Sequence, residues 1–180
     1  MIITTSWDDG CILDLKLAKL LKKYELKGTF YIPKTYLSNP LTEANIIELG
    51  REFEIGAHTL NHPDLTTLPP QKAEEEIRDS KIYLDNLLGW ETKMFCYPKG
   101  KYNEEVKKMV KEAGFSGART CRFRGFAFPD DPYEWGMTLH ACNGSKLTTL
   151  KIWYKSRISI LALLDWGIRA KLLFERALKE

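Results

Sequence analysis

Apolar and polar residues alternate along the first 140 positions in a way that predicts strands and helices in turn. Short runs of β-branched or aromatic residues predict strands, and longer stretches with apolar residues every three or four positions predict helices. The predicted strands are 2–6, 28–32, 53–57, 94–97, 116–119 and 136–141. The predicted helices are 14–24, 42–51, 69–88, 103–113 and 157–178. Strands that alternate with helices favour a mostly parallel sheet covered by helices.

Helix-capping residues support several of these boundaries. Thr42 and Asn103 can accept hydrogen bonds from first-turn N–H groups, and Gly114 suits the position after a last turn. Pro70 is tolerated in a first helical turn. The length of 180 residues and the lack of internal repeats predict one domain over residues 1–180.

Composition and charge narrow the function classes. The net charge is only +3, which argues against a dedicated nucleic-acid binder. The charge is uneven, because residues 144–180 hold eight Lys/Arg against three Asp/Glu. A solvated helix face explains this basic segment most simply. The apolar run Ile160–Leu164 is far too short to span a bilayer.

The cysteines and the N-terminus favour a cytoplasmic protein. Cys11, Cys96, Cys121 and Cys142 are scattered and contain no Cys-x-x-Cys pair, so we interpret them as reduced thiols. The first residues have no basic start, no long apolar stretch and no small-residue cleavage site, so no signal peptide is visible.

The first candidate site is the pair Asp8-Asp9, which follows a predicted strand and precedes Gly10. Successive strand residues point to opposite sides, but a turn at Gly10 can direct both carboxylates into one pocket. One acid could then bind a cation while the other acts as a base. A helix-capping Asp-Asp-Gly turn is the simpler structural explanation of this tripeptide taken alone.

The second candidate site contains two of the three histidines of the chain. His58 and His62 are four residues apart, directly after a predicted strand. On a helical turn, residues at this spacing face the same way, so both imidazoles could bind one metal. With one carboxylate they would form a three-ligand site with open positions. Such a site suits Zn²⁺, Co²⁺, Fe²⁺ or Ni²⁺, and it leaves room for a catalytic water.

Three ordered motifs give the chain a family resemblance. Ser6-Trp-Asp-Asp-Gly10 resembles the Thr-Phe-Asp-Asp-Gly motif of polysaccharide deacetylases, the NodB-homology or carbohydrate esterase family 4-like proteins. His58-Thr-Leu-Asn-His62 resembles their His-Ser/Thr-x-x-His motif. Phe95-Cys-Tyr-Pro-Lys-Gly100 resembles their third motif and follows in the right order. The resemblance covers residues 1–140, and three ordered motifs are much more specific than one.

The resemblance implies a fold and a set of roles. The fold is a distorted (β/α) barrel of mostly parallel strands. Asp9, His58 and His62 would hold a divalent metal, with zinc as the first choice, and Asp8 would be the general base. An oxyanion would rest on the metal and on a backbone N–H of the turn that contains Tyr97, Pro98 and Lys99.

The sequence departs from the family pattern at three points. Cys96 occupies the place of an arginine that holds the base, and Arg119 or Arg122 is a candidate substitute. The Asp-containing fourth motif has no clear match, since Asp130-Asp131-Pro132 is better explained as a turn. The late histidine that acts as general acid would have to be His140.

The end of the chain leads to a further prediction. Many relatives place this histidine beyond a long helix, whereas the sequence here stops at the end of the last predicted helix, at Glu180, so we expect the closing strand of the barrel to be absent. The apolar face of the helix at 157–178 must then cover the open edge or meet a second copy in a symmetric homodimer.

The predicted function is a metal-dependent hydrolase that removes acetyl from an N-acetylated sugar or polysaccharide. Its partner would be that glycan, with no nucleic acid and no membrane span. Two alternatives stay open. One is a degenerate member that binds metal and glycan with little turnover, and the other is an amidohydrolase acting on a small cyclic amide or ureide.

Overall fold

The computed structural model describes residues 4–123 and 128–137 of the 180-residue chain. Within these ranges, the residues up to Cys121 and the stretch Asp130–Trp135 form one compact unit. The prediction of a single domain over residues 1–180 extends beyond the described ranges and stays a prediction.

A parallel sheet forms the centre of this unit. Its strands are β1 (Thr4–Asp8), β2 (Lys27–Ile32), β3 (Glu54–Ala57), β4 (Met94–Cys96), β5 (Gly117–Phe123) and β6 (Trp135–Met137), in the spatial order β1-β2-β3-β4-β5-β6. Each neighbouring pair from β1 to β5 is parallel. The carboxyl ends of these strands therefore lie at one edge, where side chains from distant parts of the sequence can meet.

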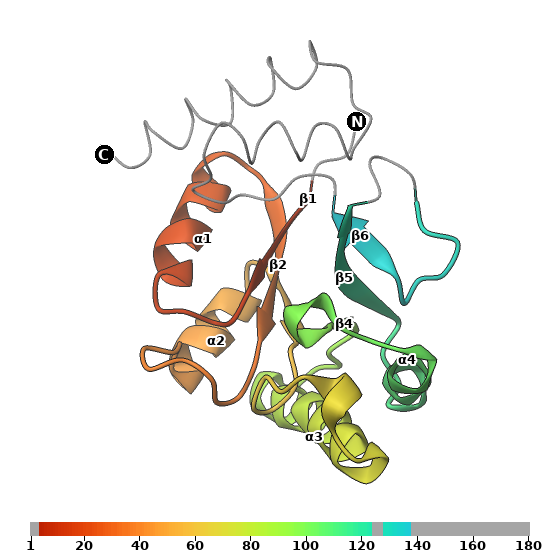
Figure 1. Ribbon diagram of the computed structural model, residues 1–180. Helices are drawn as coiled ribbons and strands as arrows, with labels where there is room; N and C mark the ends of the chain where they lie inside the picture. Colours follow the sequence, from red (N-terminus) through yellow and green to blue (C-terminus); the bar gives the residue numbers. More distant parts are fainter. Residues whose placement is uncertain (1–3, 124–127, 138–180) are drawn as a thin grey trace. The chain divides into compact units, whose positions relative to one another are not determined.

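In the part of the chain that the structure describes, four helices lie around these strands (Figure 1). They are α1 (Asp14–Lys23), α2 (Glu43–Gly50), α3 (Pro70–Leu88) and α4 (Glu104–Glu112). Two short 3₁₀ segments, Leu65–Thr67 and Pro98–Gly100, lie in the connections. The predicted caps are confirmed, because the side chains of Thr42 and Asn103 accept hydrogen bonds from the first turns of α2 and α4. None of the helices in the described ranges is long and apolar enough to cross a membrane.

The hydrophobic core lies between the strands and the helices. Its fully buried members include Phe30 and Phe95 from the sheet and Ile77 and Leu84 from α3. Ile77 and Leu84 are seven positions apart, or about two helical turns, so both lie on the face of α3 that joins the core.

The bounds of several predicted strands differ from the observed ones. The prediction ended the first strand at Ser6, whereas β1 continues to Asp8. The prediction ended β5 at Arg119, whereas the strand continues to Phe123. Its polar residues concealed the extension, although Thr120 is fully buried. The prediction for the sixth strand was residues 136–141, whereas β6 spans Trp135–Met137 and positions 138–141 lie outside the described residues.

Candidate metal and hydrolase site

The turn after β1 brings two acids to the sheet edge. Asp8 is the last residue of β1, and Asp9 and Gly10 both adopt left-handed backbone conformations, with φ of 79° and 64°. A Cβ at position 10 would come within 3.0 Å of Ile32 Cγ2, so glycine fits here for two reasons. The predicted turn at Gly10 is confirmed.

The segment His58–His62 is a loop, so the predicted helical turn is wrong. The chain leaves β3 at Ala57, and Thr59 and His62 have positive φ values of 66° and 55°, which no right-handed helix contains. The two imidazoles converge all the same, with ring centroids 4.6 Å apart. The loop therefore brings the two imidazoles together, as the i,i+4 spacing was expected to do through a helical turn.

Asp9, His58 and His62 offer three ligand atoms that lie within 4.8 Å of one another. Asp9 Oδ1 lies 3.7 Å from His58 Nε2 and 3.5 Å from His62 Nε2. Two ligands of one tetrahedral zinc, each about 2.0–2.1 Å from the metal, are about 3.3–3.4 Å apart. The observed separations come close to that value, so the three residues fit a divalent metal.

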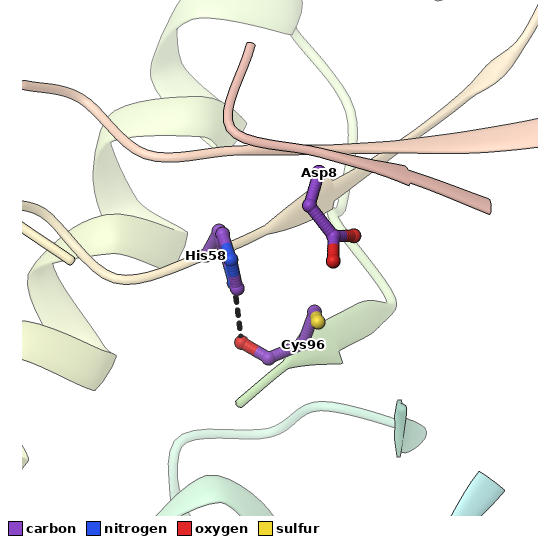
Figure 2. Close-up of side chains that lie close together, drawn as sticks. All are labelled: Asp8, His58 and Cys96. Atoms are coloured by element: carbon purple, nitrogen blue, oxygen red, sulfur yellow. Dashed lines mark hydrogen bonds between the residues drawn. The ribbon is translucent and has the colours of Figure 1, made fainter. Parts of the chain in front are cut away.

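The protonation of the two histidines also suits a metal. Desolvation lowers the pKa of His58 to about 4 and also lowers the pKa of His62, which keeps both rings neutral. His58 Nδ1 lies 2.7 Å from the Cys96 carbonyl oxygen and donates to it (Figure 2). The Nε2 atom, 3.7 Å from Asp9 Oδ1, therefore keeps its lone pair for a metal. Burial raises the pKa of Asp9, and a nearby cation would oppose that effect.

Asp8 is held by an arginine from β5. An Arg119 Nη2 N–H donates to Asp8 Oδ2, and the guanidinium also lies 3.2 Å from Cys96 Sγ. Cys96 and Arg119 are register partners on adjacent strands, so their side chains point to the same face of the sheet. The small thiol leaves space that the guanidinium enters. Asp8 Oδ1 is buried and has no hydrogen-bond partner among the described residues.

A second group of ligand atoms, from Asp8, His58 and Cys96, is also close together (Figure 2). It fits a metal less well. Burial raises the pKa of the Cys96 thiol well above its ordinary value, and only the thiolate is a good ligand. The Asp8 carboxylate is paired with Arg119. The group with Asp9 is therefore the better candidate metal site of the two.

The turn after β4 presents one candidate oxyanion donor. The Tyr97 N–H donates to the Arg119 carbonyl oxygen, and the Gly100 N–H donates to the Tyr97 carbonyl oxygen. Pro98 has no N–H group. The remaining N–H group of this turn belongs to Lys99, at φ 57°. It has no backbone acceptor among the described residues, so it is the candidate donor. The Lys99 ammonium group also helps burial to lower the pKa of His62.

Sequence reasoning missed three residues around the site. Tyr36 stacks on His62 with centroids 4.0 Å apart, and its side chain is half exposed. Asp14 is a buried third acid near Asp8 and Asp9, with its pKa raised to about 6 by burial. Glu76 binds the His58–His62 loop from α3. None of these residues stands in a motif, and only the folded chain brings them together.

The remaining predictions concern the residues after β5. Asp131 and Pro132 lie in a turn, as expected. The Ala118 N–H of β5 donates to the Pro132 carbonyl oxygen, and this bond holds the turn beside β5. His140, Cys142 and the helix predicted at 157–178 lie outside the described residues, as does any closing strand. The homodimer therefore stays a prediction.

The chain belongs to the polysaccharide deacetylase family. The family model described as "Polysaccharide deacetylase" matches residues 2–118, which contain all three motifs. The chain is 32% identical over 117 residues to YxkH of Bacillus subtilis, covering 63% of this chain and 42% of that protein. It is 29% identical over 137 residues to the peptidoglycan-N-acetylglucosamine deacetylase of Bacillus cereus, covering 74% and 60%. The chain thus spans about half the length of these relatives.

Solved structures share the fold. The Streptococcus pyogenes deacetylase PplD, solved in complex with acetate, superposes with a TM-score of 0.69 at 25% identity, covering 82% of this chain and 68% of that one. The family 4 carbohydrate esterase from Streptomyces lividans gives a TM-score of 0.57 at 19% identity, covering 68% and 63%. These likenesses confirm the predicted α/β class, with parallel strands in a distorted barrel.

Proposed function

We propose that this chain is a metal-dependent N-deacetylase acting on an N-acetylated sugar or glycan. The observation that carries the proposal is the convergence of Asp9, His58 and His62 beside the arginine-bound Asp8. Three protein ligands leave a coordination position for water, as a catalytic metal site requires. The similarity to a peptidoglycan-N-acetylglucosamine deacetylase supports an amide as the bond that is cleaved.

The residues would divide the reaction as follows. A bound divalent metal supplies Lewis acidity at the acetyl carbonyl and acidifies water. Asp8 Oδ1 takes the proton of the attacking water, while Arg119 holds the other carboxylate oxygen in place. The Lys99 N–H donates to the oxygen on which negative charge develops. The leaving amine needs a proton, for which His140 is the family's candidate.

Zinc is the proposed metal. Two neutral imidazoles and a carboxylate suit zinc well, and the same donors also accept Co²⁺, Fe²⁺ or Ni²⁺. Metal analysis of the purified protein should find one divalent ion per chain. His62→Ala should lose it, and equal metal content in both proteins would show that the assignment is wrong.

Substrate assays separate the N-deacetylase from its alternatives. We expect acetate release from N-acetylchitooligosaccharides or peptidoglycan fragments, and release about 10²–10⁴-fold slower from Asp8→Asn. An allantoin-like ureide as the better substrate would favour the cyclic amidohydrolase. Metal and glycan binding with no turnover of any of these compounds would favour the degenerate member.

The place of action stays a proposal as well. We propose that the protein acts in the cytoplasm on soluble sugars or glycan precursors, rather than outside the cytoplasm on peptidoglycan. Fractionation of cells that express the natural gene would decide between the two.

A further inference from the structure

The loop that carries both histidines is not stabilised by regular secondary structure. Thr59 and His62 adopt positive φ values, which strain the backbone of residues other than glycine. Within the loop, the His62 N–H donates to Thr59 Oγ1 at 2.9 Å. The Thr59 hydroxyl donates to the His58 carbonyl oxygen at 2.5 Å. Neither of these bonds involves the tip of the loop, Leu60 and Asn61. A contact from elsewhere must hold the tip.

Glu76 of α3 provides that contact. Its Oε2 accepts hydrogen bonds from the backbone N–H groups of Leu60 and Asn61, both at 2.9 Å. Its Oε1 accepts a third from Asn61 Nδ2 at 2.6 Å. Hydrogen bonds to an ionised carboxylate are about twice as strong as neutral ones. One side chain thus satisfies both backbone donors at the tip of the loop.

The element that carries Glu76 is itself firmly packed. Its helical neighbours Ala73 and Ile77 are almost completely buried in the core. The position of the carboxylate is therefore set by the helix packing, and the loop adapts to it. Thr35 also contacts the tip, because its N–H donates to the Leu60 carbonyl oxygen at 2.8 Å and its hydroxyl donates to Asn61 Oδ1 at 2.5 Å.

The two histidines depend on this support to different degrees. His58 directly follows β3 and is fixed by its bond to the Cys96 carbonyl oxygen. His62 is four residues further along, beyond the tip, and its Nδ1 is buried without a partner among the described residues. Its direction is therefore set by the loop and by the stacked ring of Tyr36.

We propose that Glu76 is a positioning residue that holds the His58–His62 loop in its metal-binding shape before the metal arrives. The inference rests on the metal site of the proposed function and adds how that site is built. Glu76 is outside the group of ligand atoms, and its carboxylate is occupied by the loop. It acts on the metal through His62.

Co²⁺ affinity of the full chain is the test, measured by competition with a chromophoric chelator. Glu76→Ala should weaken Co²⁺ binding about 10–100-fold, the usual effect of losing a residue that supports a ligand. The Co²⁺ affinity of Glu76→Gln should lie between those of wild type and Glu76→Ala, because the one carbonyl oxygen of glutamine can still accept from the two backbone N–H groups. Glu74→Gln is the matched control, since this exposed residue of the same helix makes the same charge change, and it should bind as wild type does.

Amide hydrogen exchange of the metal-free protein gives a second measurement. In Glu76→Ala, the Leu60 and Asn61 amides should exchange faster, while the Ile55 amide of β3 keeps its wild-type rate. A general loss of stability would speed all three and would overturn the positioning role. Wild-type Co²⁺ affinity in Glu76→Ala would overturn it as well.

The remaining outcomes are also decisive. No Co²⁺ binding by the wild-type protein would refute the metal site, and the inference with it. If Glu76→Ala does not fold, Glu76→Gln decides, because wild-type affinity together with unchanged Leu60 and Asn61 exchange would contradict the need for a carboxylate there.

Discussion

Exchanging Cys96 and Arg119 would test whether Asp8 needs a guanidinium at one place, whichever strand supplies it. The two residues are register partners on β4 and β5, and their side chains point to the same face. Adjacent strands are about 4.8 Å apart, a shift that the long arginine side chain can absorb. The double variant Cys96→Arg/Arg119→Cys should therefore place the guanidinium near Asp8 again.

The expected magnitudes follow from burial. Removing one partner of a buried ion pair costs about 3–5 kcal/mol. The Asp8 side chain is 31% exposed, so water can solvate the carboxylate in part, and Arg119→Cys should cost less, about 2 kcal/mol. Hydrolysis should fall about 100-fold, because the base loses the group that orients it. Cys96→Arg alone should destabilise the fold, since Cys96 is fully buried beside Arg119.

The assay combines thermal unfolding with acetate release from N-acetylchitopentaose by metal-loaded protein. We expect the double variant to be faster and more stable than Arg119→Cys. The reasoning is refuted if Arg119→Cys hydrolyses at the wild-type rate. It is equally refuted if the double variant folds and binds metal yet is no faster than Arg119→Cys.

Three further predictions concern the first turn and its surroundings. Asp8→Asn should keep its metal and lose about 10²–10⁴ in rate, and metal loss instead would reverse the roles of the two acids. Asp14 has its pKa raised from 3.8 to about 6, so its charge destabilises the folded state progressively as pH rises from about 4 to 6. Metal-free Asp14→Asn should accordingly unfold with a free energy about 1–3 kcal/mol higher at pH 7, and chemical denaturation below pH 4 should show no difference. Gly10→Ala should cost about 1–2 kcal/mol and weaken metal binding through Asp9, and an unchanged melting temperature would contradict the strain at φ 64°.

The sequence by itself determined the class of fold and the three residues of the candidate metal site. Local patterns suffice for both. Apolar spacing and capping side chains define α1 to α4, because each is set by neighbours within a few residues. Parallel strands place their carboxyl ends at one edge, so residues that follow β1 and β3 had to meet there. Asp9, His58 and His62 do so.

The tertiary structure alone decided how these residues are supported. The i,i+4 spacing suggested a helical turn, but His58–His62 is a loop whose tip is bound by Glu76, 15 residues beyond Asn61. Sequence reasoning left Arg119 and Arg122 as candidates for the missing arginine, and the register of β4 against β5 places Arg119 beside Asp8. Strand register and helix packing depend on contacts between distant segments, which local hydrophobic patterns do not encode.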